Sequence, residues 1–215
     1  MLVIKFSKLY PSNFISHIDM LKNTNRVLSR AGFDIQYSQG YNPHQLIFFS
    51  PPCPVGVESL CEYLTIEMDN NENVVEKFNQ ASPEGIKALE VFKVNKNPNL
   101  AYEIAFADYS VKCNGIGELN LSEIEKNSKF EILYREKEVE KVKDYKDFII
   151  GVTAVTKDEI RAKLKFGNEN LRIDRFVLGL EQRFNTKFEE AKCLKTIVYN
   201  RDGKNIDELL IKATF

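Results

Sequence analysis

The chain has 215 residues, of which 43% are hydrophobic and 11% are aromatic, so it can bury a core and is not an intrinsically disordered protein. This length accommodates one large domain or two small ones. The formal net charge of -1 at pH 7 excludes a general electrostatic attraction to nucleic acids or membranes, although a local basic surface remains compatible with it.

The N-terminus and the cysteines indicate the compartment. Residues 1–6 alternate like a strand and include Lys5, so they do not resemble a secretory signal peptide. No apolar run approaches the length of a membrane span. The four cysteines, at positions 53, 61, 113 and 193, lack the spacing of a zinc or iron–sulfur site. We therefore expect a cytoplasmic protein with reduced thiols, without a metal, a cofactor or a membrane association.

The first half of the chain predicts the order β-α-β-β-α-β. Residues 2–8 alternate in the period of a strand. Ser16 is the predicted N-cap of a helix, with Asp19 three residues later, and Gly32 is its predicted end. The predicted buried stripe of this helix consists of Ile18, Leu21, Val27 and Leu28. Further strands are expected at 35–37, resuming at 46–49, and at 61–68 and 86–94, with a second helix at 73–80.

The second half repeats this plan loosely after a polar linker at residues 95–99, which contains a helix-breaking Pro. Strands are expected at 102–111, 130–135, 148–155, 162–166 and 191–199, with a short helix from Ser122, a longer one at 171–184 and an edge strand or short helix at 206–215. The predicted fold class is α+β, with tandem ferredoxin-like (βαββαβ) units. The predicted domains are residues 1–95, which carry the motifs, and residues 100–215, a divergent second α+β unit.

Two histidines, His17 and His44, are the only ones in the chain. His17 opens the first predicted helix, where a neutral imidazole is suited to be a general base, but a purely structural role is equally expected. His44 follows a Gly/Asn/Pro loop, and the sequence leaves its distance from His17 open. Both residues are candidate catalytic groups.

The loop Tyr37-Ser-Gln-Gly-Tyr-Asn-Pro-His44 is rich in rings, donors and acceptors. A simple turn accounts for its Gly, Asn and Pro. It does not account for Tyr37, Gln39, Tyr41 and His44, whose interleaving suits an unstacked base or an RNA backbone. Ordinary packing of the aromatic residues remains the alternative.

Lys22, Arg26 and Arg30 recur every four residues and share one face of the first helix. A solvated helix face is the ordinary explanation, and a row that tracks phosphates is the functional one. Gly115-Ile-Gly lacks the third glycine and the strand–helix context of a dinucleotide-binding fingerprint.

Several motifs together resemble the radical-SAM-linked domain family of unknown function. They are Phe14-Ile-Ser-His-Ile-Asp-Met20, Arg26-Val-Leu-Ser-Arg-Ala-Gly32, Tyr37–His44, Pro54-Val-Gly-Val-Glu-Ser59 with Glu62-Tyr-Leu64, and, in the C-terminal half, Leu171-Arg-Ile-Asp-Arg-Phe-Val-Leu178. The sequence departs from the family pattern at Gln45-Leu46, where Pro-Lys is usual, and at Tyr41, where Phe is usual. The missing Lys weakens the expectation of a phosphate contact at that point.

The resemblance implies an accessory, substrate-binding partner of a separately encoded radical SAM enzyme. The sequence contains no Cys-x-x-x-Cys-x-x-Cys motif, so the chain is not itself the radical enzyme. By analogy, the substrate is RNA (tRNA or rRNA) that is modified or processed. The expected substrate-binding residues are Ser16, His17, Asp19, Arg26, Arg30, Tyr37, Gln39, Tyr41, Asn42 and His44.

Two other functions remain open at this point. The first is a metal-independent ribonuclease of the CRISPR RNA-processing type, with His17 as the base, His44 or a Tyr as the acid and a cation such as Lys22 assisting. The second is a domain that only binds other proteins, for which neither His nor Arg26 affects RNA affinity.

Overall fold

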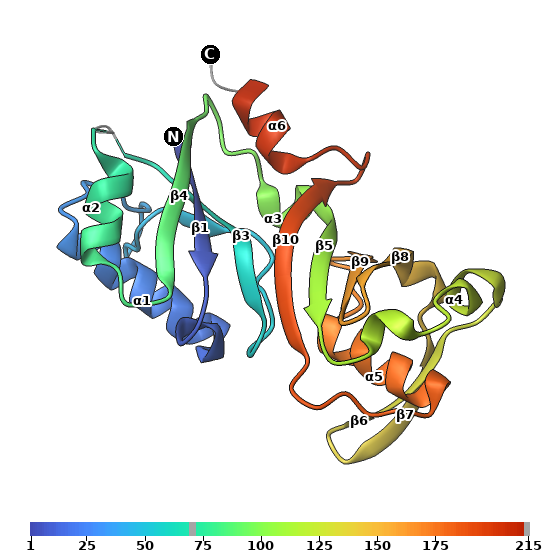
Figure 1. Cartoon of the computed structure of the whole chain (residues 1–215). Coiled ribbons are helices and arrows are strands. Elements are labelled where there is room, and N and C mark those ends of the chain that lie inside the picture. The colour runs from blue at the N-terminus through green and yellow to red at the C-terminus, as the bar shows by residue number, and fades with distance from the viewer. Residues whose placement is uncertain (69–71, 213–215) are drawn as a thin grey trace. The chain divides into compact units, whose positions relative to one another are not determined.

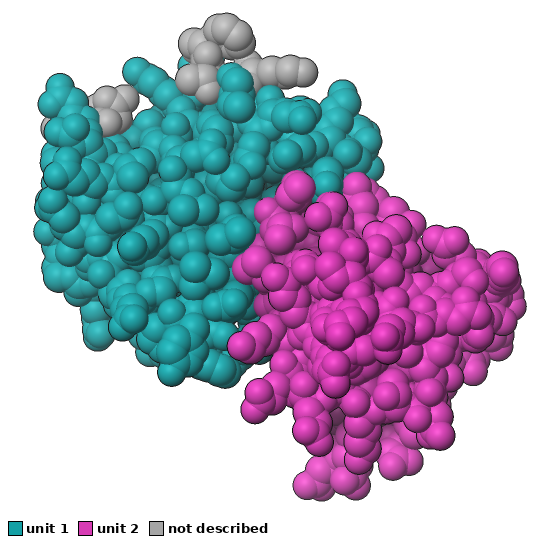
Figure 2. Space-filling view, viewed as in Figure 1, with its two compact units in different colours: residues 1–104, 198–215 teal, residues 105–197 magenta. Residues whose placement is uncertain are grey.

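The computed structural model describes residues 1–68 and 72–212 of the chain (Figure 1). The chain divides into two compact units, which Figure 2 colours separately: unit 1 is Met1–Ile104 with Val198–Phe215, and unit 2 is Ala105–Ile197. The predicted division was residues 1–95 and 100–215. The two divisions differ chiefly because the chain returns to unit 1 at Val198, close to the end of the last strand.

Unit 1 contains the element order predicted for the first half of the chain. Its elements are β1 (Leu2–Lys8), a 3-10 turn (Ser12–Phe14), α1 (His17–Arg30), β2 (Ile47–Phe49), β3 (Glu58–Ile66), α2 (Val74–Ala81), β4 (Ile86–Lys93), α3 (Leu100–Glu103) and α6 (Ile206–Lys212). The strands lie in the order β4-β1-β3-β2, and the β4–β1, β1–β3 and β3–β2 pairs are all antiparallel. In Figure 1, α1 and α2 lie together on one side of these strands.

The core of unit 1 lies between the helices α1 and α2 and the sheet. The alternating residues of β1 and β3 contribute to it, as the strand period predicts: Leu2, Ile4, Phe6, Leu64 and Ile66. α1 contributes Met20, Thr24, Val27 and Leu28. The prediction that Ile18 belongs to this stripe is wrong, because its side chain is 64% exposed. At about 100° per residue, Ile18 lies on the opposite side of the helix from Val27.

Both ends of α1 have the predicted signals. Ser16 Oγ accepts a hydrogen bond from the Asp19 amide (3.2 Å) and donates to the Asp19 carboxylate (2.7 Å). At the other end, Gly32 has φ +69°, and the amides of Gly32 and Phe33 donate to the carbonyls of Ser29 and Leu28. This Schellman arrangement satisfies carbonyls that the helix leaves open, and it requires the left-handed conformation that glycine adopts without strain.

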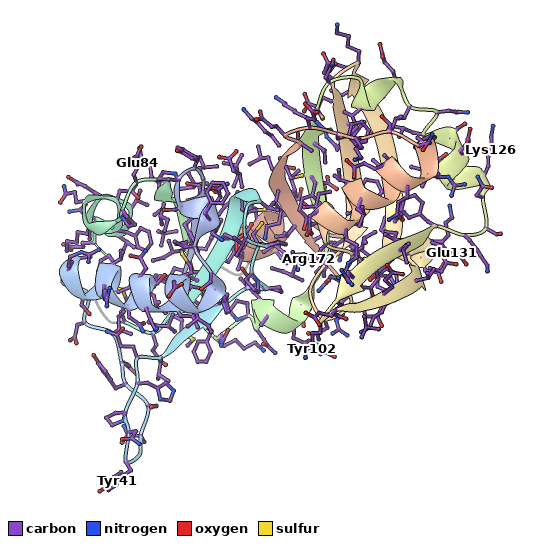
Figure 3. The ribbon with its side chains drawn as sticks, turned by 90° about the horizontal axis from the view of Figure 1, so that it is seen from below. Tyr41, Glu84, Tyr102, Lys126, Glu131 and Arg172 are labelled. Carbon is purple, nitrogen blue, oxygen red and sulfur yellow. The ribbon has the colours of Figure 1, made fainter. Side chains whose placement is uncertain are left out.

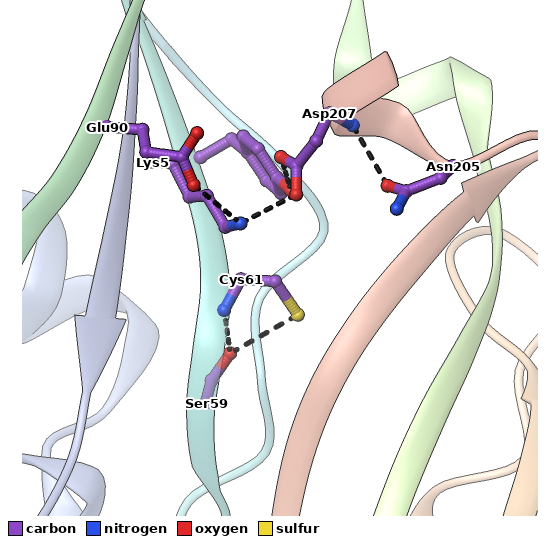
Figure 4. A network of polar contacts seen from close by, with 7 residues as sticks. Lys5, Ser59, Cys61, Glu90, Asn205 and Asp207 are labelled. Atoms are coloured by element: carbon purple, nitrogen blue, oxygen red, sulfur yellow. Dashed lines mark hydrogen bonds and ion pairs between the residues drawn. The ribbon is translucent and has the colours of Figure 1, made fainter. Parts of the chain in front are cut away.

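A polar network around the buried Tyr63 connects α6 to the sheet of unit 1 (Figure 4). Asp207 accepts from Lys5 Nζ (2.6 Å) and from the Tyr63 hydroxyl (2.7 Å), and Lys5 also pairs with Glu90 (3.2 Å). Burial lowers the pKa of Lys5, but the hydrogen bonds and charges of Asp207 and Glu90 outweigh burial and hold this pKa above its ordinary value. Burial, with the charge of Asp207, raises the pKa of Tyr63. Both residues therefore keep their protons in the folded protein over the neutral range.

Unit 2 is also α+β, with one sheet in the order β10-β5-β9-β8 and a separate hairpin, β6–β7. Its elements are β5 (Ile104–Lys112), a 3-10 turn (Ile116–Glu118), α4 (Ser122–Lys126), β6 (Glu131–Glu136), β7 (Val139–Asp144), a 3-10 turn (Lys146–Phe148), β8 (Ile149–Thr156), β9 (Glu159–Lys165), α5 (Ile173–Phe184) and β10 (Lys192–Asn200), of which unit 2 includes the part up to Ile197.

The predicted α+β class is confirmed, and most predicted elements of unit 2 are present. The sequence did not indicate β7, because all six of its residues are exposed and no buried face produces alternation. The predicted strand at 102–111 starts later than expected, at Ile104, because Leu100–Glu103 form the short helix α3.

Candidate functional site

Residues 36–46 form a hairpin that leaves the body of unit 1, named here the 36–46 hairpin. Tyr37 and Gln45 are bridge partners, the Ser38 amide donates to the His44 carbonyl (2.8 Å), and the Leu46 amide donates to the Gln36 carbonyl (2.8 Å). Gly40 has φ +138°, which suits glycine and no other residue well. The expected strand at 35–37 is thus reduced to isolated bridges, and the strand expected at 46–49 is β2.

The tip of the 36–46 hairpin exposes its side chains to solvent. Figure 3 shows Tyr41 at the far end of the hairpin, pointing away from the rest of unit 1, and its side chain is 101% exposed. Gln39, Asn42 and His44 are exposed as well, and Tyr37 is 53% exposed. Because burial does not explain these rings, packing against the core is excluded as the reason for Tyr41.

An open hollow of about 530 Å³ lies between α1 and the 36–46 hairpin, named here the basic hollow. It brings together four of the predicted site residues, Arg26, Arg30, Tyr37 and His44. Asn25, Ser29 and Gln45 complete its lining, and sequence reasoning did not select them for the site. Helical spacing placed the two Arg on one face, but it did not indicate that the hairpin would lie opposite that face.

Some polar groups of the basic hollow form hydrogen bonds with other residues of unit 1. Arg30 donates to the Ala81 carbonyl (2.7 Å), and the Ser38 hydroxyl hydrogen-bonds with Nδ1 of His44 (3.0 Å). For Arg26 the structure has no hydrogen bond or ion pair with any residue of 1–68 or 72–212. An exposed guanidinium beside a tyrosine and an oriented imidazole is suited to bind a phosphate next to a stacked ring.

His17 lies in different surroundings from His44. It is the first residue of α1, it is exposed, and its ring meets the Phe49 ring edge to face at 6.1 Å between centroids. It lines a small hollow of about 10 Å³ and an open one of about 350 Å³, and His44 lines neither of them. The structure therefore does not bring the two histidines together in one hollow.

Ser16 and Asp19 are used in the cap of α1, where each binds the other, so the structure explains both without a ligand. Lys22 is exposed but does not line the basic hollow. The predicted row of three cations on α1 is thus divided, with two members in the hollow and one outside it.

Two charged residues beside His17 were missed by sequence reasoning. Lys8 and Glu62 line the small hollow and are only 4% and 6% exposed. Lys8 Nζ donates to the Ile15 carbonyl (3.1 Å), and Glu62 accepts from the Cys53 amide (3.3 Å). The sequence contained a signal for Glu62, because this carboxylate lies inside the predicted strand at 61–68. A charged residue is buried in such a strand only with partners, so its position indicated a polar contact.

Residues 1–68 and 72–212 contain neither a metal-binding cluster nor a membrane-spanning helix. No group of three or more His, Cys, Asp or Glu side chains is placed to hold a metal ion in that part of the chain. No helix there is both long and apolar enough to cross a membrane.

Residues 1–178 match the model of a protein family described as "Uncharacterized protein conserved in bacteria (DUF2344)". The chain belongs to this family. The DUF2344 match covers α1, the 36–46 hairpin and unit 2 as far as the first half of α5. No curated protein matches the sequence. The description of DUF2344 contains no reference to radical SAM enzymes, so that association remains a proposal.

Proposed function

We propose that this DUF2344 protein binds RNA in the basic hollow and along the 36–46 hairpin. One observation carries the proposal: Arg26, Arg30, Tyr37 and His44, which come from two separate segments, line one open hollow beside a projecting, fully exposed tyrosine. Exposed cations that contact the backbone and rings that stack on unpaired bases are the usual elements of single-strand recognition.

In this proposal the protein acts as the substrate-binding partner of a separately encoded radical SAM enzyme that modifies or processes RNA in the cytoplasm. The motifs at residues 14–20, 26–32 and 37–44 support this, through their resemblance to radical-SAM-linked domains. The sequence itself has no Cys-x-x-x-Cys-x-x-Cys motif, so the cluster chemistry belongs to the partner.

We also propose that each unit is a ferredoxin-like fold. The order β4-β1-β3-β2 of unit 1 and the order β10-β5-β9-β8 of unit 2 support this assignment, because both correspond to strands 4-1-3-2 of a βαββαβ plan. In unit 2 the hairpin β6–β7 is then an insertion between its first and second strands.

Replacing Arg26 with Ala is expected to weaken the binding of a single-stranded RNA about tenfold at low salt and to reduce the salt slope by about 1, because one phosphate contact is lost. Filter binding over a series of salt concentrations measures both quantities. Lys22→Ala is the matched control, since Lys22 is an exposed cation of the same helix outside the hollow. Equal effects of the two variants would contradict the proposal.

Incubation of the same RNA with the protein, followed by denaturing gel electrophoresis, tests the ribonuclease alternative, which one observation favours. His17 shares a hollow with the buried Lys8 and Glu62, a group of three titratable side chains. If the wild-type protein cleaves the RNA and His17→Ala abolishes cleavage, the ribonuclease replaces the binding function.

Gentle affinity purification of the tagged protein from its host tests the proposed partner. We expect mass spectrometry to identify a radical SAM enzyme that remains bound after nuclease treatment while RNA is lost. Recovery of RNA without such an enzyme would contradict the accessory role and leave RNA binding intact.

A further inference from the structure

Unit 2 contains a cluster of three cations and three aromatic rings where the β6–β7 hairpin meets α5, named here the cation–aromatic cluster. Its members are Tyr134, Lys143, Tyr145, Phe148, Lys165 and Arg175. They come from β6, β7, the following 3-10 turn and its N-cap Tyr145, the end of β9 and the first turn of α5. No member belongs to the site in unit 1.

Arg175 is held in a fixed orientation within this cluster. Its guanidinium lies 3.7 Å from the centroid of the Tyr134 ring, and one of its nitrogens donates to the Tyr145 hydroxyl at 2.8 Å. The Tyr145 ring is buried (2% exposed), so it anchors the arginine to the body of the unit. The remaining guanidinium donors have no hydrogen-bond partner among residues 1–68 and 72–212, and they are available to an external acceptor.

The two lysines share the Phe148 ring. Lys143 Nζ lies 4.8 Å from the Phe148 centroid and 4.9 Å from the Tyr145 centroid, and Lys165 Nζ lies 5.1 Å from the Phe148 centroid. Lys165 is paired with Glu169, so Lys143 supplies the ammonium group of the two that has no ion pair among the described residues.

Among the described residues, a carboxylate forms an ion pair with one of the three cations of the cluster, Lys165, and none does so with the other two. Glu169 pairs with Lys165 (3.1 Å), Glu136 with Lys141 (2.6 Å) and Asp174 with Arg172 (2.8 Å). Asp144, adjacent to Lys143 in sequence, accepts from the amides of Phe130 and Lys146, both at 2.9 Å, and these bonds lower its pKa. In the described part of the chain, Lys143 and Arg175 have no ion pair with a carboxylate.

We propose that the cation–aromatic cluster is a second binding surface for single-stranded RNA, with Lys143 and Arg175 as its phosphate contacts. The exposed Lys143 and the half-buried Arg175 lie beside the half-buried rings of Tyr134 and Phe148, and cations next to rings suit an extended polyanion with flat bases better than a compact anion. Tyr134 is half-buried and Lys143 is exposed, so both are accessible from solvent. This surface is independent of the proposed function of unit 1.

The experiment compares Lys143→Glu with Lys157→Glu in the full-length protein. Lys157 is an exposed lysine of the β8–β9 turn, and the side chain has no ion pair within residues 1–68 and 72–212, so its replacement changes the net charge of unit 2 equally. Fluorescence polarisation with a labelled single-stranded RNA is expected to show about tenfold weaker binding and a salt slope reduced by at least 1 for Lys143→Glu. We expect Lys157→Glu to bind like the wild type.

Two further measurements keep the outcome decisive. Arg175→Gln is expected to weaken binding in the same direction, and circular dichroism checks that both variants remain folded. Competition against the labelled strand distinguishes a phosphate site from an RNA site. Unlabelled RNA and inorganic phosphate are compared as competitors at equal phosphate concentration. An RNA site requires that the RNA displace the labelled strand far better than inorganic phosphate does. Unchanged binding by a folded Lys143→Glu protein overturns the proposal, and so does equally effective competition by inorganic phosphate.

The Arg26→Ala variant separates this inference from the proposed function of unit 1. If both surfaces bind RNA, Arg26→Ala and Lys143→Glu each weaken binding and the double variant is weaker than either. If only Lys143→Glu weakens RNA binding, the cation–aromatic cluster is supported and the site in unit 1 is contradicted. If only Arg26→Ala weakens RNA binding, the site in unit 1 is supported and the cluster is contradicted.

Discussion

Shortening the 36–46 hairpin is expected to weaken binding of single-stranded RNA about 50-fold, because one stacking ring is worth about 1–3 kcal/mol and polar contacts are lost with it. The change replaces residues 39–43 with Asn-Gly and thereby removes Gln39, Tyr41 and Asn42. The Ser38 amide already donates to the His44 carbonyl, so these two residues form the last bonded pair of the shortened hairpin. Asn-Gly is the preferred two-residue turn for such a pair.

The shortened protein should keep the melting temperature of the wild type. Tyr41 is fully exposed, and no residue from 39 to 43 belongs to the buried core of unit 1. Isothermal titration with the RNA gives the affinity, and Tyr41→Ala alone should account for much of the loss. Tyr41→Phe is the matched control, because it keeps the ring and should bind normally. If the shortened protein remains folded and binds RNA as tightly as the wild type, the hairpin is not part of the binding surface.

Gly117→Ala is expected to have the largest effect on stability. The free energy of unfolding should fall by about 3 kcal/mol, because the close-packed site has no room for a methyl group. A Cβ at position 117 would overlap the carbonyl oxygen of Thr156 and lie 3.1 Å from the carbonyl carbon of Lys157. Both obstacles are backbone atoms, and the Gly117 amide donates to the Lys157 carbonyl (2.9 Å), so neither the 3-10 turn at Ile116–Glu118 nor the β8–β9 turn can move away without a large cost.

Differential scanning calorimetry measures this loss, and Gly151→Ala serves as its control. Gly151 lies in β8 of the same unit, and a Cβ there meets nothing within 4 Å. Because alanine reduces the entropy of the unfolded chain, the control should be neutral or slightly stabilising, by at most about 1 kcal/mol. A melting temperature for Gly117→Ala equal to that of Gly151→Ala would show that the turn can shift.

The glycines of the Gly115-Ile-Gly segment illustrate how a motif acquires a structural explanation. The sequence excluded a dinucleotide-binding loop, since the third glycine and the context were missing. The structure supplies the reason for both residues: Gly115 has φ +71°, and Gly117 allows the close approach of the β8–β9 turn. The second reason involves residues some 40 positions away in the chain, which no local pattern indicates.

The sequence predicted the secondary structure well wherever an element is determined by residues close together in the chain. The Ser16–Asp19 cap, the Gly32 end of α1 and the strand β1 were each predicted from neighbouring residues, and all are present. The prediction for Ile18 was wrong, because at about 100° per residue its side chain lies on the opposite side of α1 from the buried Val27. β7 was missed because a strand whose residues are all exposed has no hydrophobic period.

By itself, the sequence determined the α+β class, the order of elements in unit 1 and the candidate residues on α1 and in the 37–44 loop. Only the tertiary structure decided which of those candidates share a surface. It brought Arg26 and Arg30 to Tyr37 and His44, placed His17 in other hollows, and gathered the cation–aromatic cluster from the stretch 134–148, the end of β9 and the start of α5. The physical reason is that caps and strand periods are fixed by local geometry. The charge and shape of a binding surface arise only when distant segments pack together.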